Sequence, residues 1–297
     1  VKLYVKRVFI TDACDELCPP WLRFMKGLID SEDLPLNVSR EMLQNNPALA
    51  RIKTALVKRV LGDLKKMANK KPEDYATFWE NFGAVLKEGI YEDQDNREAV
   101  LKLSRFHSTH DDALTSLEDY IGRMKEGQEA IYYISGEDIG ALTKSPQLEG
   151  FRARGIEVLM MTDPVDEFWL PAVGEHEGKP LRSATRSGND LDAIKEEGAD
   201  DSDKKDDKKA DEENVPGLDA LVAMVKLELG DSIKDVRISN RLTDSPVCLS
   251  ADDGDMDIRM EQLLRQHNQL NEQITRVLEV NGKHPLIMAL AGIAGAD

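Results

Sequence analysis

The chain contains 297 residues, of which 41% are hydrophobic and 32% are charged, and its formal net charge is −17. This length suits two domains with sizeable hydrophobic cores. So acidic a surface excludes nucleic acid and anionic membranes as partners unless the charge is segregated. Part of the charge is segregated, because Asp190–Glu213 holds twelve acidic residues and five lysines. We interpret this segment as a solvated linker, with a dedicated binding tail as the alternative.

Cysteine usage and hydropathy indicate a cytoplasmic protein. The three cysteines, Cys14, Cys18 and Cys248, are odd in number and follow no signal peptide, which favours a reducing compartment over a disulfide framework. The longest apolar run, residues 285–296, is shorter than the ~18 residues needed to span a bilayer. We therefore expect no membrane anchor.

The first third of the chain is expected to be mainly helical after an initial strand. The run over 1–10 is expected to be a half-buried strand, because Val1, Leu3 and Val5 alternate with Lys2, Tyr4 and Lys6. Apolar residues then recur at helical spacing over 19–29, 46–69, 72–88 and 97–104. Asn46 followed by Pro47 predicts the start of the longest helix. We interpret the aromatic residues of the 72–88 helix as core.

The pattern changes to alternating strands and helices beyond residue 130. Strands are expected over 131–135 and 156–163 with helical sequence between them, which indicates a βαβ unit with a parallel sheet. Helices and short strands alternate again near the C-terminus. The predicted fold is therefore α/β and α+β: a first domain over 1–187, an acidic linker over 188–214, and a small α+β domain over 215–297.

Common catalytic signatures are absent from the sequence. It contains no GxGxxG, GxSxG, HExxH or paired CxxC motif. Cys14 and Cys18 could on paper join His107 and His110 in a four-ligand zinc site, but three residues separate the thiols on an expected loop and the histidines flank a polar turn. We therefore predict no metal site.

Arg40 lies between an extended run and a helix-forming run, and local chemistry leaves its role open. A surface arginine would pair with carboxylates such as Asp30, Glu32, Asp33 or Glu41. A guanidinium fixed at a turn would instead suit the oxygens of a phosphate. Local composition favours the surface arginine, and local chemistry does not settle the choice.

A second ambiguous feature is an apolar helix face near residues 255–270. Met260, Leu263 and Leu264 follow Met256 by four, seven and eight residues, so all four side chains share one face of that helix. Such a face is ordinarily part of a core. Methionines exposed on a helix face, however, suit binding to varied partners.

Several stretches resemble the bacterial heat-shock protein 90 chaperone family. They include LYVKRVFITD at 3–12, SEDLPLNVSREMLQ at 31–44, YYISGE at 132–137, SPQLEGFRARGIEVLMMTDPVDEF at 145–168 and DVRISNRLTDSPVCLS at 235–250. The resemblance covers nearly the whole chain outside 188–213. It implies that 1–187 is a middle domain lacking its first part, and that 215–297 is a C-terminal dimerisation domain lacking its terminal helices.

The resemblance also implies an ATP-driven, dimeric molecular chaperone. Arg40, in the SRE motif, would contact the γ-phosphate of ATP held by another domain, and Gln44 would support that loop. ATP and Mg²⁺ would bind to the full-length protein. Because the nucleotide-binding domain and its catalytic glutamate are expected upstream of Val1, we expect this chain alone to bind and hydrolyse no ATP and to dimerise poorly.

Unfolded or partly folded client proteins are the partners that the resemblance implies, with homodimerisation and other chaperones as further contacts. The implied client-binding residues are Glu167, Phe168 and Trp169, together with an exposed Met256, Met260, Leu263 and Leu264 face. No nucleic acid or membrane is expected as a partner. The alternative from another class is a stand-alone acidic scaffold or ATP-independent holdase, and a metal-dependent hydrolase is a third hypothesis that rests on the Cys/His arrangement alone.

Overall fold

The computed structural model describes residues 1–12, 17–34, 46–186, 191, 194, 215–252, 254–270 and 274–295. They form two compact units, Val1–Arg105 with Ser116–Glu118, and Phe106–Thr115 with Asp119–Asp297. This division falls within the expected first domain, whereas the expected boundaries near 187 and 214 lie outside the described residues. The three-part division drawn from the sequence stays a prediction. Mixed helices and sheets confirm the predicted fold class.

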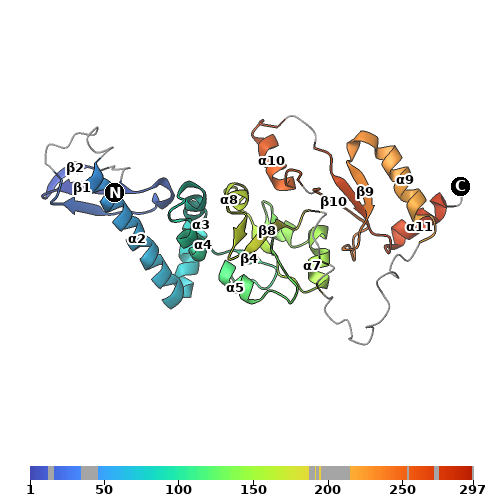
Figure 1. The fold of residues 1–297 in the computed structure, drawn as a ribbon, viewed down its shortest axis with the longest axis horizontal. Coiled ribbons are helices and arrows are strands. Elements are labelled where there is room, and N and C mark those ends of the chain that lie inside the picture. The colour runs from blue at the N-terminus through green and yellow to red at the C-terminus, as the bar shows by residue number, and fades with distance from the viewer. Residues whose placement is uncertain are drawn as a thin grey trace. The chain divides into compact units, whose positions relative to one another are not determined.

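The first unit begins with a small mixed sheet in the order β2-β1-β3 (Figure 1). Its strands are β1 (Lys2–Val5), β2 (Val8–Thr11) and β3 (Leu28–Ser31), and β1 is antiparallel to β2 and parallel to β3. The predicted alternation in β1 is confirmed, because Leu3 and Val5 are buried in a cluster with Leu17, Leu34 and Leu49. The single strand expected over 1–10 is wrong, because a turn at Lys6 and Arg7 divides it into β1 and β2.

The helix expected over 19–29 is wrong. Only a 3₁₀ turn, η2 (Pro20–Leu22), forms there, and the chain then continues as β3. Trp21 packs so closely against α3 that a Cβ on Gly89 would lie 2.7 Å from its ring. Burial of Trp21 and pairing of β3 with β1 are long-range contacts, and they override the local helical spacing.

Helices make up the rest of the first unit. These are α2 (Pro47–Lys70), α3 (Pro72–Glu92) and α4 (Arg97–Leu103), and α5 (Leu117–Gly122) begins at its boundary with the second unit. The predicted start of α2 is confirmed, because the Asn46 side chain accepts a hydrogen bond from the amide of Ala48 at 2.9 Å. Helix α3 buries Tyr75 and Trp79, which confirms the core reading of part of its aromatic stripe.

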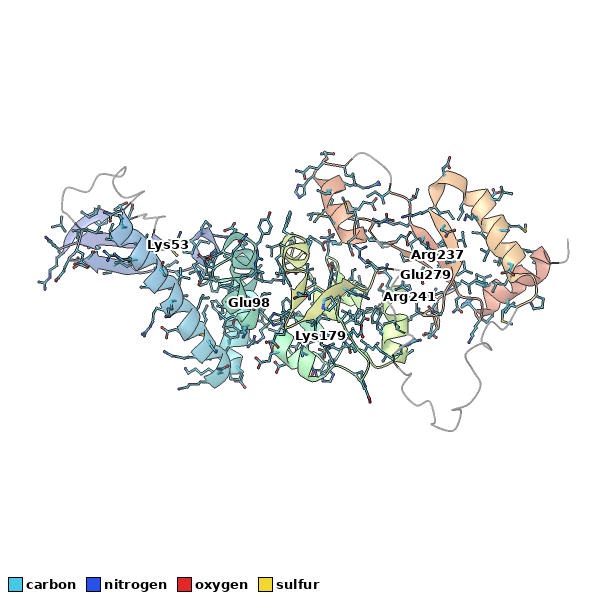
Figure 2. The ribbon with its side chains drawn as sticks, viewed as in Figure 1. Lys53, Glu98, Lys179, Arg237, Arg241 and Glu279 are labelled. Atoms are coloured by element: carbon cyan, nitrogen blue, oxygen red, sulfur yellow. The ribbon has the colours of Figure 1, made fainter. Side chains whose placement is uncertain are left out.

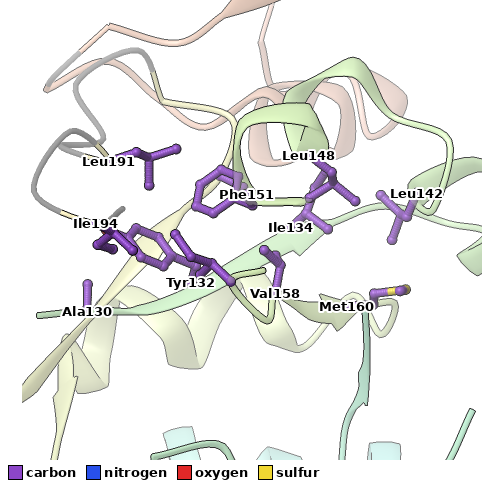
Figure 3. Packing of buried hydrophobic residues seen from close by; sticks show 12 residues of the cluster. Ala130, Tyr132, Ile134, Leu142, Leu148, Phe151, Val158, Met160, Leu191 and Ile194 are labelled. Atoms are coloured by element: carbon purple, nitrogen blue, oxygen red, sulfur yellow. The ribbon is translucent and has the colours of Figure 1, made fainter. Parts of the chain in front are cut away.

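The second unit contains the predicted parallel βαβ arrangement. Its larger sheet has the order β4-β6-β5-β8-β7, in which β5 is parallel to both β6 and β8. The strands are β4 (His107–Ser108), β5 (Ile131–Ser135), β6 (Leu159–Met161), β7 (Glu175–His176) and β8 (Lys179–Ser183). The intervening helices are α6 (Ile139–Leu142), η3 (Pro146–Leu148), α7 (Glu149–Ala153) and α8 (Asp166–Val173). Figure 3 shows the core around Tyr132 and Phe151. The rings of these two residues pack edge to face, with their centroids 4.9 Å apart.

A smaller sheet in the second unit has the order β10-β11-β9. Its strands are β9 (Asp235–Ile238), β10 (Val247–Ser250) and β11 (Val277–Val280), and its helices are α9 (Leu218–Leu229), η5 (Gly230–Ser232), α10 (Ile258–Gln266) and α11 (Pro285–Ala294). Helices α9 and α11 pack together with the sheet around Leu218, Val280 and Ile287. Gly217 has a φ of +86°, and a Cβ there would lie 2.1 Å from the carbonyl oxygen of Ala291, so the helix contact requires glycine.

Candidate functional site

Arg40 and Gln44, the predicted catalytic-loop residues, lie outside the described residues. One of the carboxylates expected to pair with Arg40 has another partner within the described part of the chain. Asp30 Oδ1 accepts a hydrogen bond from the backbone amide of Arg7 at 3.1 Å. The role of Arg40 therefore stays a prediction that rests on its motif.

The three predicted client-binding residues of α8 have different environments. Trp169 is fully buried, its indole N–H donates to Asp166 Oδ1 at 2.7 Å, and its ring centroid lies 6.0 Å from that of Phe106. Consecutive residues of a helix point about 100° apart, so Phe168 does not share the buried direction of Trp169 and is 45% exposed. In this conformation Phe168 can contact a partner and Trp169 supports α8 from the core.

Glu167 is buried, with 6% of its surface exposed. Burial raises the pKa of this carboxyl to about 7, and the charges of Asp257 and Asp166 act in the same direction. The hydroxyl of Ser135 and the guanidinium of Arg259 oppose the shift. Glu167 on α8 is thus within electrostatic reach of the first residues of α10, so these two predicted client-binding segments are neighbours within the second unit.

Helix α10 is shorter than predicted, which corrects the position of Met256. Asp257 caps the helix by accepting from the amide of Arg259 at 3.1 Å, and Met256 lies before the cap. The carbonyl of Met256 accepts from Arg276 Nη1 at 2.6 Å. A polar residue that captures the free amides of the first turn sets the helix start, whereas apolar spacing alone does not.

The remaining α10 residues are only partly accessible. Leu263 is 7% exposed and belongs to the buried set, whereas Met260 and Leu264 are half-buried. The predicted exposed face is therefore divided between packing and solvent. Met260 and Leu264 are the members that a partner could reach.

The described residues hold no group of three or more His, Cys, Asp or Glu side chains placed to bind a metal ion. Cys14 of the hypothetical zinc set lies outside them. None of the helices within the described ranges is long and apolar enough to cross a membrane.

Similarity to known proteins identifies the family. All 297 residues match the sequence model of the family described as Hsp90 protein. The chain belongs to the Hsp90 protein family. This Hsp90-family chain also resembles, over 98% of its length, curated proteins named Chaperone protein HtpG, which confirms the resemblance drawn from the sequence motifs.

Three of these relatives illustrate the degree of similarity. The proteins of Paramagnetospirillum magneticum and Roseobacter denitrificans are each 56% identical over 292 residues, which cover 98% of this chain and 46% of the relative. The protein of Ehrlichia ruminantium (strain Gardel) is 50% identical over 291 residues, covering 97% of this chain and 45% of the relative. The Hsp90-family chain thus spans about half the length of the curated relatives it matches.

Sequence reasoning missed the contacts that join the two sheets of the second unit. Glu149, at the start of α7, accepts hydrogen bonds from the amides of Thr243, Asp244 and Ser245 and from the Ser245 hydroxyl. Burial would raise the pKa of Glu149, but these hydrogen bonds outweigh it and hold the pKa below its ordinary value. The partners are more than ninety residues away in the chain, so no local pattern signals the contact.

A buried ion pair lies beside this contact. Arg241 and Glu279 form a bidentate pair with both distances at 2.8 Å, and their side chains are 5% and 7% exposed (Figure 2). Arg241 Nη1 also donates to the carbonyl of Ala184 at 2.9 Å, which follows β8. Glu149 thus links α7 to the turn before β10, and Arg241 links β11 to the residue that follows β8.

Proposed function

We propose that this Hsp90-family chain is the client-binding part of an ATP-dependent molecular chaperone that acts on unfolded or partly folded proteins. The observation that carries the proposal is the exposed aromatic ring of Phe168 on α8, next to the start of α10 with its half-buried Met260 and Leu264. Exposed apolar side chains on a fixed framework suit the apolar segments that unfolded proteins expose.

Photo-crosslinking from position 168 tests client binding directly. A benzoylphenylalanine replacing Phe168 should crosslink to a chemically unfolded protein and fail to crosslink to the same protein in its native state. The matched control is the same replacement at Tyr91, an aromatic residue of the first unit that is 53% exposed. Equal crosslinking from both positions would show that capture depends on exposure alone and would contradict the proposed site.

The nucleotide-dependent part of the proposal rests on the SEDLPLNVSREMLQ motif. Arg40 would stabilise charge on the γ-phosphate of ATP only when another domain docks, and Gln44 would support its loop. In this proposal the full-length protein binds ATP and Mg²⁺, forms a homodimer, contacts other chaperones and resides in the cytoplasm. In that protein, Arg40→Ala should lower ATP turnover at least about tenfold with little change in nucleotide affinity, as expected for loss of a transition-state contact. Unchanged turnover would refute this role.

The alternative is an acidic holdase that needs no ATP. It is favoured by one observation: Phe168, Met260 and Leu264 all belong to the second unit, which has its own buried cores, so capture requires no nucleotide domain. Client release distinguishes the two. An ATP-dependent chaperone should release a bound client faster when ATP is added to the full-length protein, whereas a holdase should release it at the same rate.

A further inference from the structure

A cleft of about 780 Å³ lies in the second unit between α10 and the segment that runs from the end of β5 to η3. Apolar side chains line part of it: Ile134, Leu142 and Ile258. The face of α10 that lines the cleft carries Ile258, Arg259, Gln262, Arg265 and Gln266, and it does not include Met260 or Leu264. The cleft is therefore distinct from the apolar side chains proposed above to contact clients.

Arg259 is a buried cation whose hydrogen-bonded carboxylate partner is exposed. The residue is 8% exposed, and its Nη1 donates to Glu137 Oε1 at 2.9 Å. The Glu137 side chain is 64% exposed and also accepts from Gln266 Nε2 at 3.2 Å. Because Glu137 follows β5 and is largely in solvent, its carboxylate can leave Arg259 and become hydrated at little cost. The guanidinium cannot do the same, because it is buried. The Glu167 carboxyl is within electrostatic reach of it, but Glu137 is the carboxylate to which it donates a hydrogen bond, and leaving those donors unpaired is unfavourable.

The rest of the cleft is locally cationic in a chain of net charge −17. Its ionisable lining residues are Glu137, Asp138, Lys144, Arg259 and Arg265. Asp138 is already occupied, since its carboxylate caps α6 by accepting from the amide of Ala141 at 2.8 Å. Arg265 is paired with Glu261 at 2.7 Å. Once Glu137 moves away, Arg259 and Lys144 are therefore left to attract an incoming carboxylate.

We propose that this cleft binds an extended polypeptide segment in which a carboxylate side chain stands beside an apolar one, and that this carboxylate replaces Glu137 at Arg259. A guanidinium donates two parallel hydrogen bonds to a carboxylate, which gives the site its selectivity. The apolar residues receive the neighbouring side chain. The amides of Gln262 and Gln266 can donate to and accept from peptide groups, a capacity that the alkyl chain of a fatty acid would leave unused.

Binding of labelled peptides to the whole 297-residue chain, followed by fluorescence anisotropy, tests the proposal. Three peptides of equal length alternate leucine with aspartate, asparagine or lysine. The aspartate peptide should bind at least about tenfold more tightly than the asparagine peptide, because a charge-assisted pair replaces a neutral hydrogen bond. The lysine peptide should bind most weakly. Equal affinities for the aspartate and asparagine peptides would overturn the proposal.

Two variants separate recognition from structural support. Glu137→Gln removes the internal competitor and should increase affinity for the aspartate peptide about three- to tenfold, a gain that general loosening of the cleft would not produce. Lys144→Gln should lower the affinity several-fold, whereas Lys102→Gln, an exposed lysine of the first unit, is the matched control and should leave it unchanged. No gain with Glu137→Gln would overturn the exchange of carboxylates.

Competition with decanoate distinguishes a polypeptide from a lipid occupant. Displacement of the aspartate peptide by decanoate at lower concentration than by unlabelled peptide would overturn the polypeptide assignment. The inference rests on the proposed function only in that its occupant is a polypeptide. If position 168 crosslinks unfolded protein but the three peptides bind alike, the proposal for the cleft is refuted and the proposed function stands. If the cleft binds the aspartate peptide selectively but position 168 does not crosslink, the proposed function is refuted and the proposal for the cleft stands.

Discussion

Removing the Glu149 carboxylate should destabilise the second unit strongly. Glu149 is 7% exposed and accepts three backbone N–H groups at 2.8, 2.9 and 3.1 Å and the Ser245 hydroxyl. Hydrogen bonds to a charged group contribute about 1.5–3 kcal/mol each, and a buried donor without an acceptor costs about 1–3 kcal/mol. Glu149→Ala should lower the free energy of unfolding by about 3–5 kcal/mol. This is less than the summed contributions of the individual hydrogen bonds, because the 243–245 turn can relax toward water once it is released.

Urea unfolding followed by tryptophan fluorescence measures this loss in the second unit. The chain has three tryptophans, of which Trp21 and Trp79 lie in the first unit and Trp169 in the second. In a background carrying Trp21→Phe and Trp79→Phe, fluorescence therefore reports the second unit. Exposed Glu129 supplies the matched control, and Glu129→Ala should change the free energy of unfolding by less than about 0.5 kcal/mol.

Acid dependence gives a second test of the same contact. The pKa of Glu149 is lower in the folded chain than its ordinary value, so its contribution to stability is complete above the unfolded pKa of about 4.3 and is lost as pH falls through the folded pKa. Glu149→Ala should therefore lose least stability at low pH. A loss below about 1 kcal/mol at pH 7 would refute the view that this carboxylate joins the two sheets.

Three further predictions concern buried groups of the second unit. The pKa of Glu167 is raised from 4.5 to about 7, so the free energy of unfolding of the second unit should fall by about 3 kcal/mol as pH rises from about 4.5 to 7 and then level off. Glu167→Gln should remove this pH dependence, which urea titrations at several pH values measure. Gly217→Ala places a Cβ 2.1 Å from the Ala291 carbonyl oxygen at a φ of +86°, and should cost more than about 2 kcal/mol by thermal unfolding. Arg241→Ala leaves Glu279 buried without its cation and should cost about 3–5 kcal/mol, whereas the double variant with Glu279→Ala should cost less than the sum of the single ones.

Local signals in the sequence predicted local structure well. The Asn46 cap and Pro47 determine where α2 begins, and both act through groups within one helical turn. The strand–helix alternation beyond residue 130 likewise predicted the parallel pairing of β5 with β6, because uniformly apolar strands such as β6 are typical of sheets covered on both faces.

The errors lie where distant contacts decide the outcome. The 19–29 segment has helical spacing but forms β3, because β1 supplies a pairing partner. The sequence also could not distinguish Phe168 from its neighbour Trp169, since which of them faces the core depends on how α8 lies against Phe106. Glu149 was missed for the same reason, because its hydrogen-bond donors lie in the 243–245 turn.

Suppression of aggregation by the whole chain tests the central claim, client binding by α8 and α10, most directly. Phe168→Asp with Met260→Asp should abolish protection of a thermally unfolded protein without ATP, while the unfolding transition of the second unit changes little because both side chains are at least partly exposed. Tyr91→Asp, at an exposed aromatic residue of the first unit, should protect like the wild type. Full protection by the double variant, with its folding intact, would contradict the account.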